Sequence, residues 1–228
     1  MLTFGVIDDG VGIFPTYYKL RQVVCGNFVG MLLDGDFPLS RLNKQQLYNV
    51  GRDAVSFLSQ SGCDVIAISS VALSSVCKRL SEQSCVPLYF SEAPVVHASM
   101  YTASNVLVCC ENAGYSRQNA ANALYCVMDD FPVLAQEGDE RSIVDYIEQC
   151  VQPYLGQFDC IALASSSMNL YKNCFRRVCP NARVFDSLDG IARKIRKKYA
   201  KIAKDDGFCK IIDKQGADVT EKYGIFLE

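Results

Sequence analysis

Histidine is nearly absent from the chain, since His97 is the only one among 228 residues. No Cys-x-x-Cys pair occurs either, although the chain has twelve cysteines. Structural zinc sites commonly combine such pairs with histidines, so we expect no metal site and no metal cofactor. We interpret His97 as an ordinary polar residue on a helix.

The chain also lacks a long apolar stretch and an excess of charge of either sign. No run approaches the roughly 18 apolar residues of a membrane-spanning helix, and the first residues form a strand-like segment in place of a signal peptide. The net charge is −2 and the sequence pI is near 5.5. This balance gives no electrostatic reason to expect nucleic acid or a membrane as partner, and we expect a cytoplasmic protein.

One basic stretch, residues 192–204, needs a separate interpretation. Apolar side chains recur in and just before it at helical spacing, at Ile191, Ile195, Tyr199 and Ile202. This spacing predicts an amphipathic helix whose charged residues form a solvated face, in preference to a nucleic-acid or membrane element.

The positions of the cysteines do not indicate disulfide bonds. They lie mostly inside apolar segments, which favours buried, reduced thiols over disulfides at Cys63, Cys109, Cys110, Cys126, Cys160 and Cys174.

Short apolar runs alternate with longer segments of helical spacing along the whole chain. Strands are expected at 2–7, 28–34, 64–69, 86–90, 105–110, 159–164 and 182–186. Helices are expected at 43–60, 71–83, 94–103, 116–127, 139–154, 169–178 and 187–204. This alternation predicts an α/β fold with parallel strands.

A strand that ends in serines occurs twice, in "DVIAISS" at 64–70 and in "DCIALASSS" at 159–167. Each copy has an aspartate before or at the strand start and a helical segment after the serines, which indicates a doubled unit. We therefore predict two pseudo-symmetric lobes, each with a parallel sheet flanked by helices. Residues 1–93 plus 186–228 would form the first lobe and residues 94–185 the second, with a shared cleft at the carboxyl ends of the strands.

Several segments resemble the glutamate racemases of the aspartate/glutamate racemase superfamily. "FGVIDDGVG", residues 4–12, is similar to the family's opening Phe/Ile-Gly-Val-Phe-Asp-Ser-Gly-Val-Gly. "VPLYFSEAPVV", "NVLVCCENA" and "RVFDSLDGIARK" follow in the family's order. The resemblance covers nearly the whole chain. It implies a cofactor-independent (PLP-independent) amino-acid racemase fold, an amino acid or carboxylate-like ligand, and a possible homodimer.

Both catalytic positions of that family carry serine here. Its members use two opposed cysteine thiols to remove and return the substrate α-proton, and the resemblance places Ser69 and Ser165 at those positions. Ser70 takes the place of Ser69 if the first register shifts by one. One hypothesis is a catalytically impaired or repurposed homologue; the other is an active glutamate or aspartate racemase or isomerase that uses non-cysteine groups. We favour the first, because acid–base groups contribute roughly 10²–10⁴ in rate each.

The resemblance implies further substrate-binding positions at Asp8, Asp9, Ser40, Ser70, Cys110, Ser166 and Ser167. Asp9 replaces a family serine, and its carboxylate would repel an anionic substrate group within about 5 Å. A polar turn residue is the alternative for Asp9. Cys110 ends a predicted strand, where packing in the sheet is the alternative to ligand contact.

Overall fold

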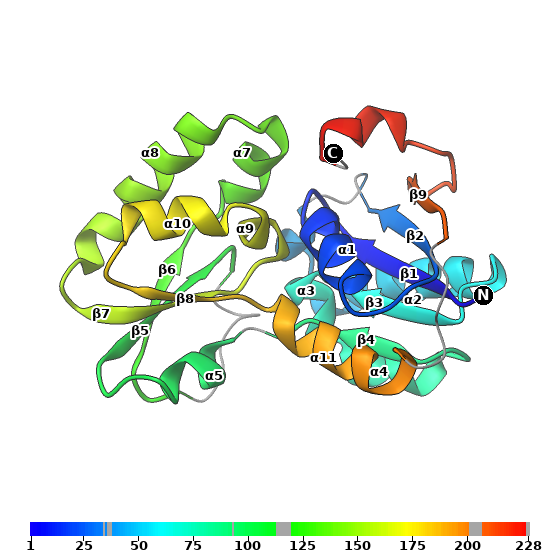
Figure 1. The fold of residues 1–228 in the computed structure, drawn as a ribbon, viewed down its shortest axis with the longest axis horizontal. Coiled ribbons are helices and arrows are strands. Elements are labelled where there is room, and N and C mark those ends of the chain that lie inside the picture. Colours follow the sequence, from blue (N-terminus) through cyan, green and yellow to red (C-terminus); the bar gives the residue numbers. More distant parts are fainter. Residues whose placement is uncertain (34, 36–37, 93, 113–119, 201–206, 227–228) are drawn as a thin grey trace.

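The structure is a computed structural model that describes residues 1–33, 35, 38–92, 94–112, 120–200 and 207–226 (Figure 1). Two β-sheets lie side by side, and helices flank both of them (Figure 1). Every strand pairing within these sheets is parallel. The predicted fold class, two parallel sheets flanked by helices, is therefore confirmed.

The first sheet has five strands in the order β4-β3-β1-β2-β9. These are β1 (Thr3–Asp8), β2 (Asn27–Leu32), β3 (Val65–Ile68), β4 (Leu88–Phe90) and β9 (Cys209–Ile212). The helices that accompany it are α1 (Ile13–Arg21), α2 (Lys44–Gln60), α3 (Val71–Ser74), α4 (Cys77–Gln83) and α11 (Leu188–Tyr199), with 3₁₀ turns at Leu39–Arg41 and Glu221–Phe226. Because side chains alternate along a strand, Phe4 and Val6 pack with α1 and α11 while Ile7 packs with α2 on the other face.

The second sheet has four strands in the order β6-β5-β7-β8. These are β5 (Asn105–Cys110), β6 (Ala123–Val127), β7 (Phe158–Leu163) and β8 (Arg183–Phe185). Its helices are α5 (Val95–Ser99), α7 (Phe131–Glu137), α8 (Glu140–Val151), α9 (Ser166–Leu170) and α10 (Lys172–Val178), with a 3₁₀ turn at Gln152–Tyr154. The chain passes from the first sheet to the second between β4 and β5 and returns after β8 (Figure 1).

The two halves are joined by a continuous hydrophobic core. One cluster of buried side chains includes Phe4 and Phe14 from the first half and Phe131 and Phe175 from the second. Helix α1 contacts α9 and thereby connects the two parts of this cluster. Burial of aromatic side chains contributes several kcal/mol in total, so neither half is expected to be stable in this form without the other.

Some predicted elements differ from the observed ones. The sequence predicts a helix over 116–127, but Ala123–Val127 form strand β6 beside β5; residues 116–119 lie outside the described part. "ALYCV" is a short apolar run, which periodicity alone does not assign to a strand or a helix, and in this edge strand only Cys126 is buried. Strand β9 and helices α1 and α7 were not predicted. The segments 71–83 and 94–103 contain shorter helices than expected.

The predictions for the cysteines and the basic helix agree with the structure. All six cysteines expected in apolar segments are buried, and all twelve cysteines have free thiols. In α11 the apolar side chains Ile191, Ile195 and Tyr199 face the core. Ile202, the fourth residue of that pattern, lies outside the described residues. No helix in the described part of the chain is long and apolar enough to cross a membrane.

Candidate functional site

Asp8 connects the two halves of the molecule at the carboxyl end of β1. Its buried carboxylate accepts hydrogen bonds from the Ser69 hydroxyl and, at 3.1 Å, from the backbone N–H of Gly10. The Ser166 hydroxyl of α9, in the second half of the molecule, also donates to Asp8, at 3.1 Å from the same Oδ1 that accepts from Gly10. The first serine motif and the second therefore meet at one carboxylate.

Glu111 makes a corresponding contact in the second half. It follows β5, and the hydroxyl of Ser165, which follows the neighbouring strand β7, donates a hydrogen bond to Glu111 Oε1. The Ser167 hydroxyl lies 2.9 Å from that of Ser165 and 3.4 Å from the same carboxylate oxygen. Parallel strands end at one edge of a sheet, which brings these side chains together. Ser69 and Ser165, the two predicted catalytic positions, thus each have a carboxylate beside them.

Asp9 is hydrogen-bonded to the 3₁₀ turn Leu39–Arg41. Its Oδ2 accepts a hydrogen bond of 2.7 Å from the backbone N–H of Leu39, at the start of the 3₁₀ turn Leu39–Arg41. From the second half, the Asn112 side-chain amide donates to the carbonyl of Ser40 at 3.0 Å. The turn is therefore attached to both halves through polar contacts.

A small cleft lies among these groups. It is lined by Asp9, Ser40, Ser70, Val71 and Ala72 from the first half and by Glu111, Asn112, Ala164, Ser165 and Ser166 from the second. Its volume of about 10 Å³ leaves room for about one water molecule. None of the described lining residues is a lysine or an arginine. The cleft is thus nearly closed, and its described walls carry carboxylates without a cationic partner.

Burial raises the pKa of all three carboxyl groups. Burial, together with the nearby charge of Asp9, raises the pKa of Asp8 well above its usual value, against the hydrogen bonds from Ser69 and Ser166. Burial also raises the pKa of Asp9. Burial and the charge of Asp9 raise the pKa of Glu111 to about 7, and hydrogen bonds from serines oppose this shift. The site therefore favours a bound proton or another cation.

The two candidate serines of the first motif are placed differently. Ser70 lines the cleft, and its hydroxyl accepts a hydrogen bond of 3.4 Å from the backbone N–H of Leu73, which caps α3. Ser69 is buried behind it, with its hydroxyl toward Asp8 and, at 3.1 Å, the carbonyl of Ile7. Of the two registers left open by the sequence, Ser70 is the one that borders the cleft.

Cys110 does not line the cleft, although the sequence places it among the substrate-binding candidates. Its side chain is fully buried in the cluster around α5, and its thiol lies 3.9 Å from the carbonyl oxygen of Cys126. The next residue, Glu111, lines the cleft instead. The sequence signal for Glu111 is its place as the first polar residue after a buried strand, the same signal that marked Ser69 and Ser165.

Among the described residues, no three His, Cys, Asp or Glu side chains are grouped so that they could hold a metal ion. His97 is exposed on α5, where its ring contacts Tyr101 at a centroid distance of 5.2 Å. The predicted placement of His97 on a helix is confirmed.

Comparison with known proteins shows similarity at the level of structure. No protein-family model and no curated protein matches the chain. Glutamate racemase from Escherichia coli, crystallised with L-glutamate, superimposes with a TM-score of 0.78 at 18% identity, over 93% of this chain and 88% of that one. Glutamate racemase from Aquifex pyrophilus gives a TM-score of 0.73 at 19% identity, over 99% and 95%. Aspartate racemase from Picrophilus torridus gives 0.60 at 17% identity, over 90% and 96%. The chain has the fold of these proteins.

Proposed function

We propose that the chain is a divergent member of the aspartate/glutamate racemase superfamily whose cleft binds a small amine-bearing metabolite and does not racemise glutamate. The shared fold and the matching order of sequence motifs support membership. The observation that carries the ligand class is the pair of carboxyls that line the cleft, buried Asp9 and half-buried Glu111, with buried Asp8 next to Asp9 and no cation on the described walls.

Electrostatics favour an amine over a dicarboxylate in this cleft. Two unit charges about 5 Å apart interact by roughly 3 kcal/mol at an effective dielectric constant of about 20. A ligand carboxylate beside Asp9 or Glu111 would be repelled by that amount, whereas an ammonium group would be attracted. An ammonium group would also satisfy the carboxylate oxygens with its three N–H donors. The bound ligand therefore presents a primary ammonium group to Asp9 and Glu111.

The missing thiols explain why racemisation is not expected. A cysteine ionises near pH 8.5 and its thiolate accepts protons readily, whereas a serine hydroxyl does not ionise near neutral pH. The hydroxyls of Ser69 and Ser165 instead donate hydrogen bonds to carboxylates. Donation to a carboxylate keeps the proton on the serine oxygen. Proton transfer by these two serines is thus suppressed.

A second candidate function rests on the same carboxylates. Glu111, with a pKa of about 7, is in the range of an effective general base, and Asp8, at the end of β1 in the first half, is a second carboxyl with a raised pKa. A carboxylate on one face would remove the α-proton, and a protonated carboxyl on the other face would return one. This arrangement would give an active racemase or isomerase without cysteine.

We also infer from the cysteines that the protein works in the cytoplasm. Twelve unpaired cysteines are typical of a protein that works in a reducing compartment such as the cytoplasm.

A matched pair of ligands tests the ligand class. We expect 1,5-diaminopentane to bind and glutarate, which has the same number of carbons and the opposite charge, not to bind in isothermal titration calorimetry. Binding should strengthen between pH 5 and pH 8, because Glu111 loses its proton around pH 7 while the amines stay charged. Asp9→Asn should weaken binding by about tenfold, and Asp53→Asn on the exposed face of α2 should not. Tighter binding of glutarate than of the diamine would contradict the proposal.

Proton exchange tests the loss of racemisation. Wild-type protein incubated with L- and D-glutamate and aspartate in deuterated water should show no α-deuterium above background by NMR. The double variant Ser69→Cys with Ser165→Cys should also stay far below a typical turnover of roughly 10 s⁻¹, because the carboxylates still repel the substrate. Robust exchange by the wild type would instead support the second candidate function, and Glu111→Gln and Asp8→Asn would then identify the base.

A further inference from the structure

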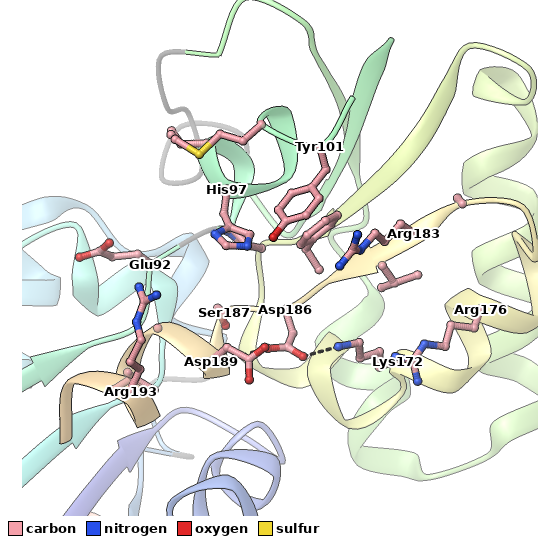
Figure 2. A pocket seen from close by; sticks show the side chains of 18 of the residues that line it. Glu92, His97, Tyr101, Lys172, Arg176, Arg183, Asp186, Ser187, Asp189 and Arg193 are labelled. Carbon is pink, nitrogen blue, oxygen red and sulfur yellow. Dashed lines mark hydrogen bonds and ion pairs between the residues drawn. The ribbon is translucent and has the colours of Figure 1, made fainter. Parts of the chain in front are cut away.

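A second and much larger cavity lies outside the cleft, beside the two segments that connect the sheets (Figure 2). Its volume is about 1130 Å³, and its walls come from the end of β4, from α5, β8, α10 and the start of α11. We call it the α5–α11 pocket. Ligand sites for small molecules commonly have volumes of about 300–1,000 Å³, so this pocket can hold a ligand of nucleotide size.

Aromatic rings form one wall of the α5–α11 pocket. The rings of His97, Tyr101 and Phe185 contact one another, with centroid distances of 5.2 Å, 5.5 Å and 5.1 Å. Tyr101 remains 51% exposed despite these contacts. An exposed aromatic side chain of this kind offers a flat, apolar surface against which a ligand ring can stack.

Arginine side chains lie beside these rings. The guanidinium of Arg183 lies 4.3 Å from the centroid of the Tyr101 ring and 5.1 Å from that of Phe185 (Figure 2). Arg176 of α10 also lines the pocket and donates a hydrogen bond of 3.1 Å to Asn173. A guanidinium that stacks on a ring keeps the N–H groups at its edge available for hydrogen bonds, and Arg183 lines the pocket.

The acidic residues of the pocket already have lysine partners. Asp186 pairs with Lys172, Glu92 with Lys194 at 2.9 Å, and Asp189 with Lys19 at 2.6 Å. In contrast, Arg176, Arg183 and Arg193 have no carboxylate partner among the described residues. The lining holds five lysines and arginines against three acidic residues, an excess of two positive charges on a chain whose net charge is −2.

We propose that the α5–α11 pocket binds an anion that carries an aromatic ring, with the ring against Tyr101 and His97 and the anionic group at Arg183 and Arg176. Guanidinium groups bind phosphate and carboxylate oxygens through two parallel hydrogen bonds, and an arginine that is not already paired with a carboxylate is suited to this contact. One molecule that carries both a ring and an anionic group can use both contacts, because the guanidinium of Arg183 lies only 4.3 Å from the centroid of the exposed Tyr101 ring. This site is separate from the cleft and does not depend on the function proposed for it.

Three probes separate the contributions of ring and charge: adenosine monophosphate, adenosine and inorganic phosphate. Titrations monitored by NMR chemical shifts should show adenosine monophosphate bound at least about tenfold more tightly than either fragment. Indole-3-acetate, an aromatic carboxylate, tells whether the anion must be a phosphate. Added salt should weaken binding, since the anionic contact is partly exposed.

Variants locate the site. Arg183→Met combined with Arg176→Met, and separately Tyr101→Ala, should each weaken adenosine monophosphate binding at least about tenfold. The matched control is Arg79→Met, because Arg79 stacks on Tyr48 at 3.5 Å on α4, away from this pocket. Circular dichroism checks that each variant is folded. Binding that is unchanged in the pocket variants, equal affinity for phosphate alone, or no saturable shift with any probe would overturn the proposal.

Discussion

Replacing Glu111 by glutamine should raise the melting temperature at pH 8 by roughly 4–8 °C and leave it unchanged near pH 4. Burial and the charge of Asp9 raise the pKa of Glu111 from 4.5 to about 7. A carboxyl whose pKa is raised by folding binds its proton more tightly in the folded state. The protein therefore loses stability as the pH rises from about 4.5 through about 7, where the buried group must ionise.

Glutamine removes this ionisation and keeps the oxygen that accepts the hydrogen bonds from Ser165 and Ser167. Because the carboxyl is only half-buried, solvent screening reduces the expected gain to about 2 kcal/mol above pH 7. Thermal and urea denaturation, followed by circular dichroism at pH 4, 6 and 8, would measure it. Glu82→Gln, at an exposed position of α4, is the control and should change stability at none of these pH values. A variant less stable than wild type at pH 8 would show that the ionised Glu111 is stabilising.

The same variant should lose affinity for 1,5-diaminopentane. An ionised carboxylate in the empty cleft lowers the stability of the fold, and a bound ammonium group would compensate its charge. Residues of a binding site commonly reduce stability in this way. A gain in stability together with a loss of binding would distinguish this role from a purely structural one.

The second large effect is expected at Gly12. Gly12→Ala should lower the free energy of unfolding by about 3 kcal/mol, because the new methyl group has no space. A Cβ at this position would lie 2.4 Å from the Cβ and Oγ of Ser166 and 2.6 Å from its carbonyl carbon. Ser166 cannot move away easily, since its hydroxyl is bonded to Asp8. Helix α1 would have to separate from α9.

Gly190→Ala is the matched control for that measurement. Gly190 lies within α11, and a Cβ there would meet no atom within 4 Å. Alanine should therefore stabilise the helix by about 0.5–1 kcal/mol, through its better helix propensity. Urea denaturation of both variants gives the comparison; equal effects of the two substitutions would show that the approach of Gly12 to Ser166 is not a tight contact.

Much of the fold could be predicted from the sequence, because the central strands are continuous apolar runs and the serine motif occurs twice. The edge strand β6 could not, since its side chains are mostly half-buried and "ALYCV" fits a helix equally well. Strand β9 pairs with β2 far along the chain, and local patterns do not show such pairings. The positions of the lobe boundaries and the roles of the named site residues remain predictions.

The candidate site was predicted through the serine positions, and its carboxylate in the second half was missed. The predicted contact was Cys110, a buried residue, whereas the next residue, Glu111, lines the cleft. Asp9 borders the cleft. The pairing of Ser165 with Glu111 depends on how β5 and β7 align in the sheet, which spacing along the chain does not reveal.

The small volume of the cleft has a kinetic consequence. A space of about 10 Å³ admits no metabolite, so the two halves must part before a ligand enters. Parting breaks the contacts of Ser166 with Asp8 and of Asn112 with Ser40. Association is then gated by the frequency of opening, and the apparent affinity is the intrinsic affinity multiplied by the open fraction. Because every ligand uses the same opening, a substitution that loosens these contacts scales all affinities by one factor, whereas a change in recognition alters their ratios.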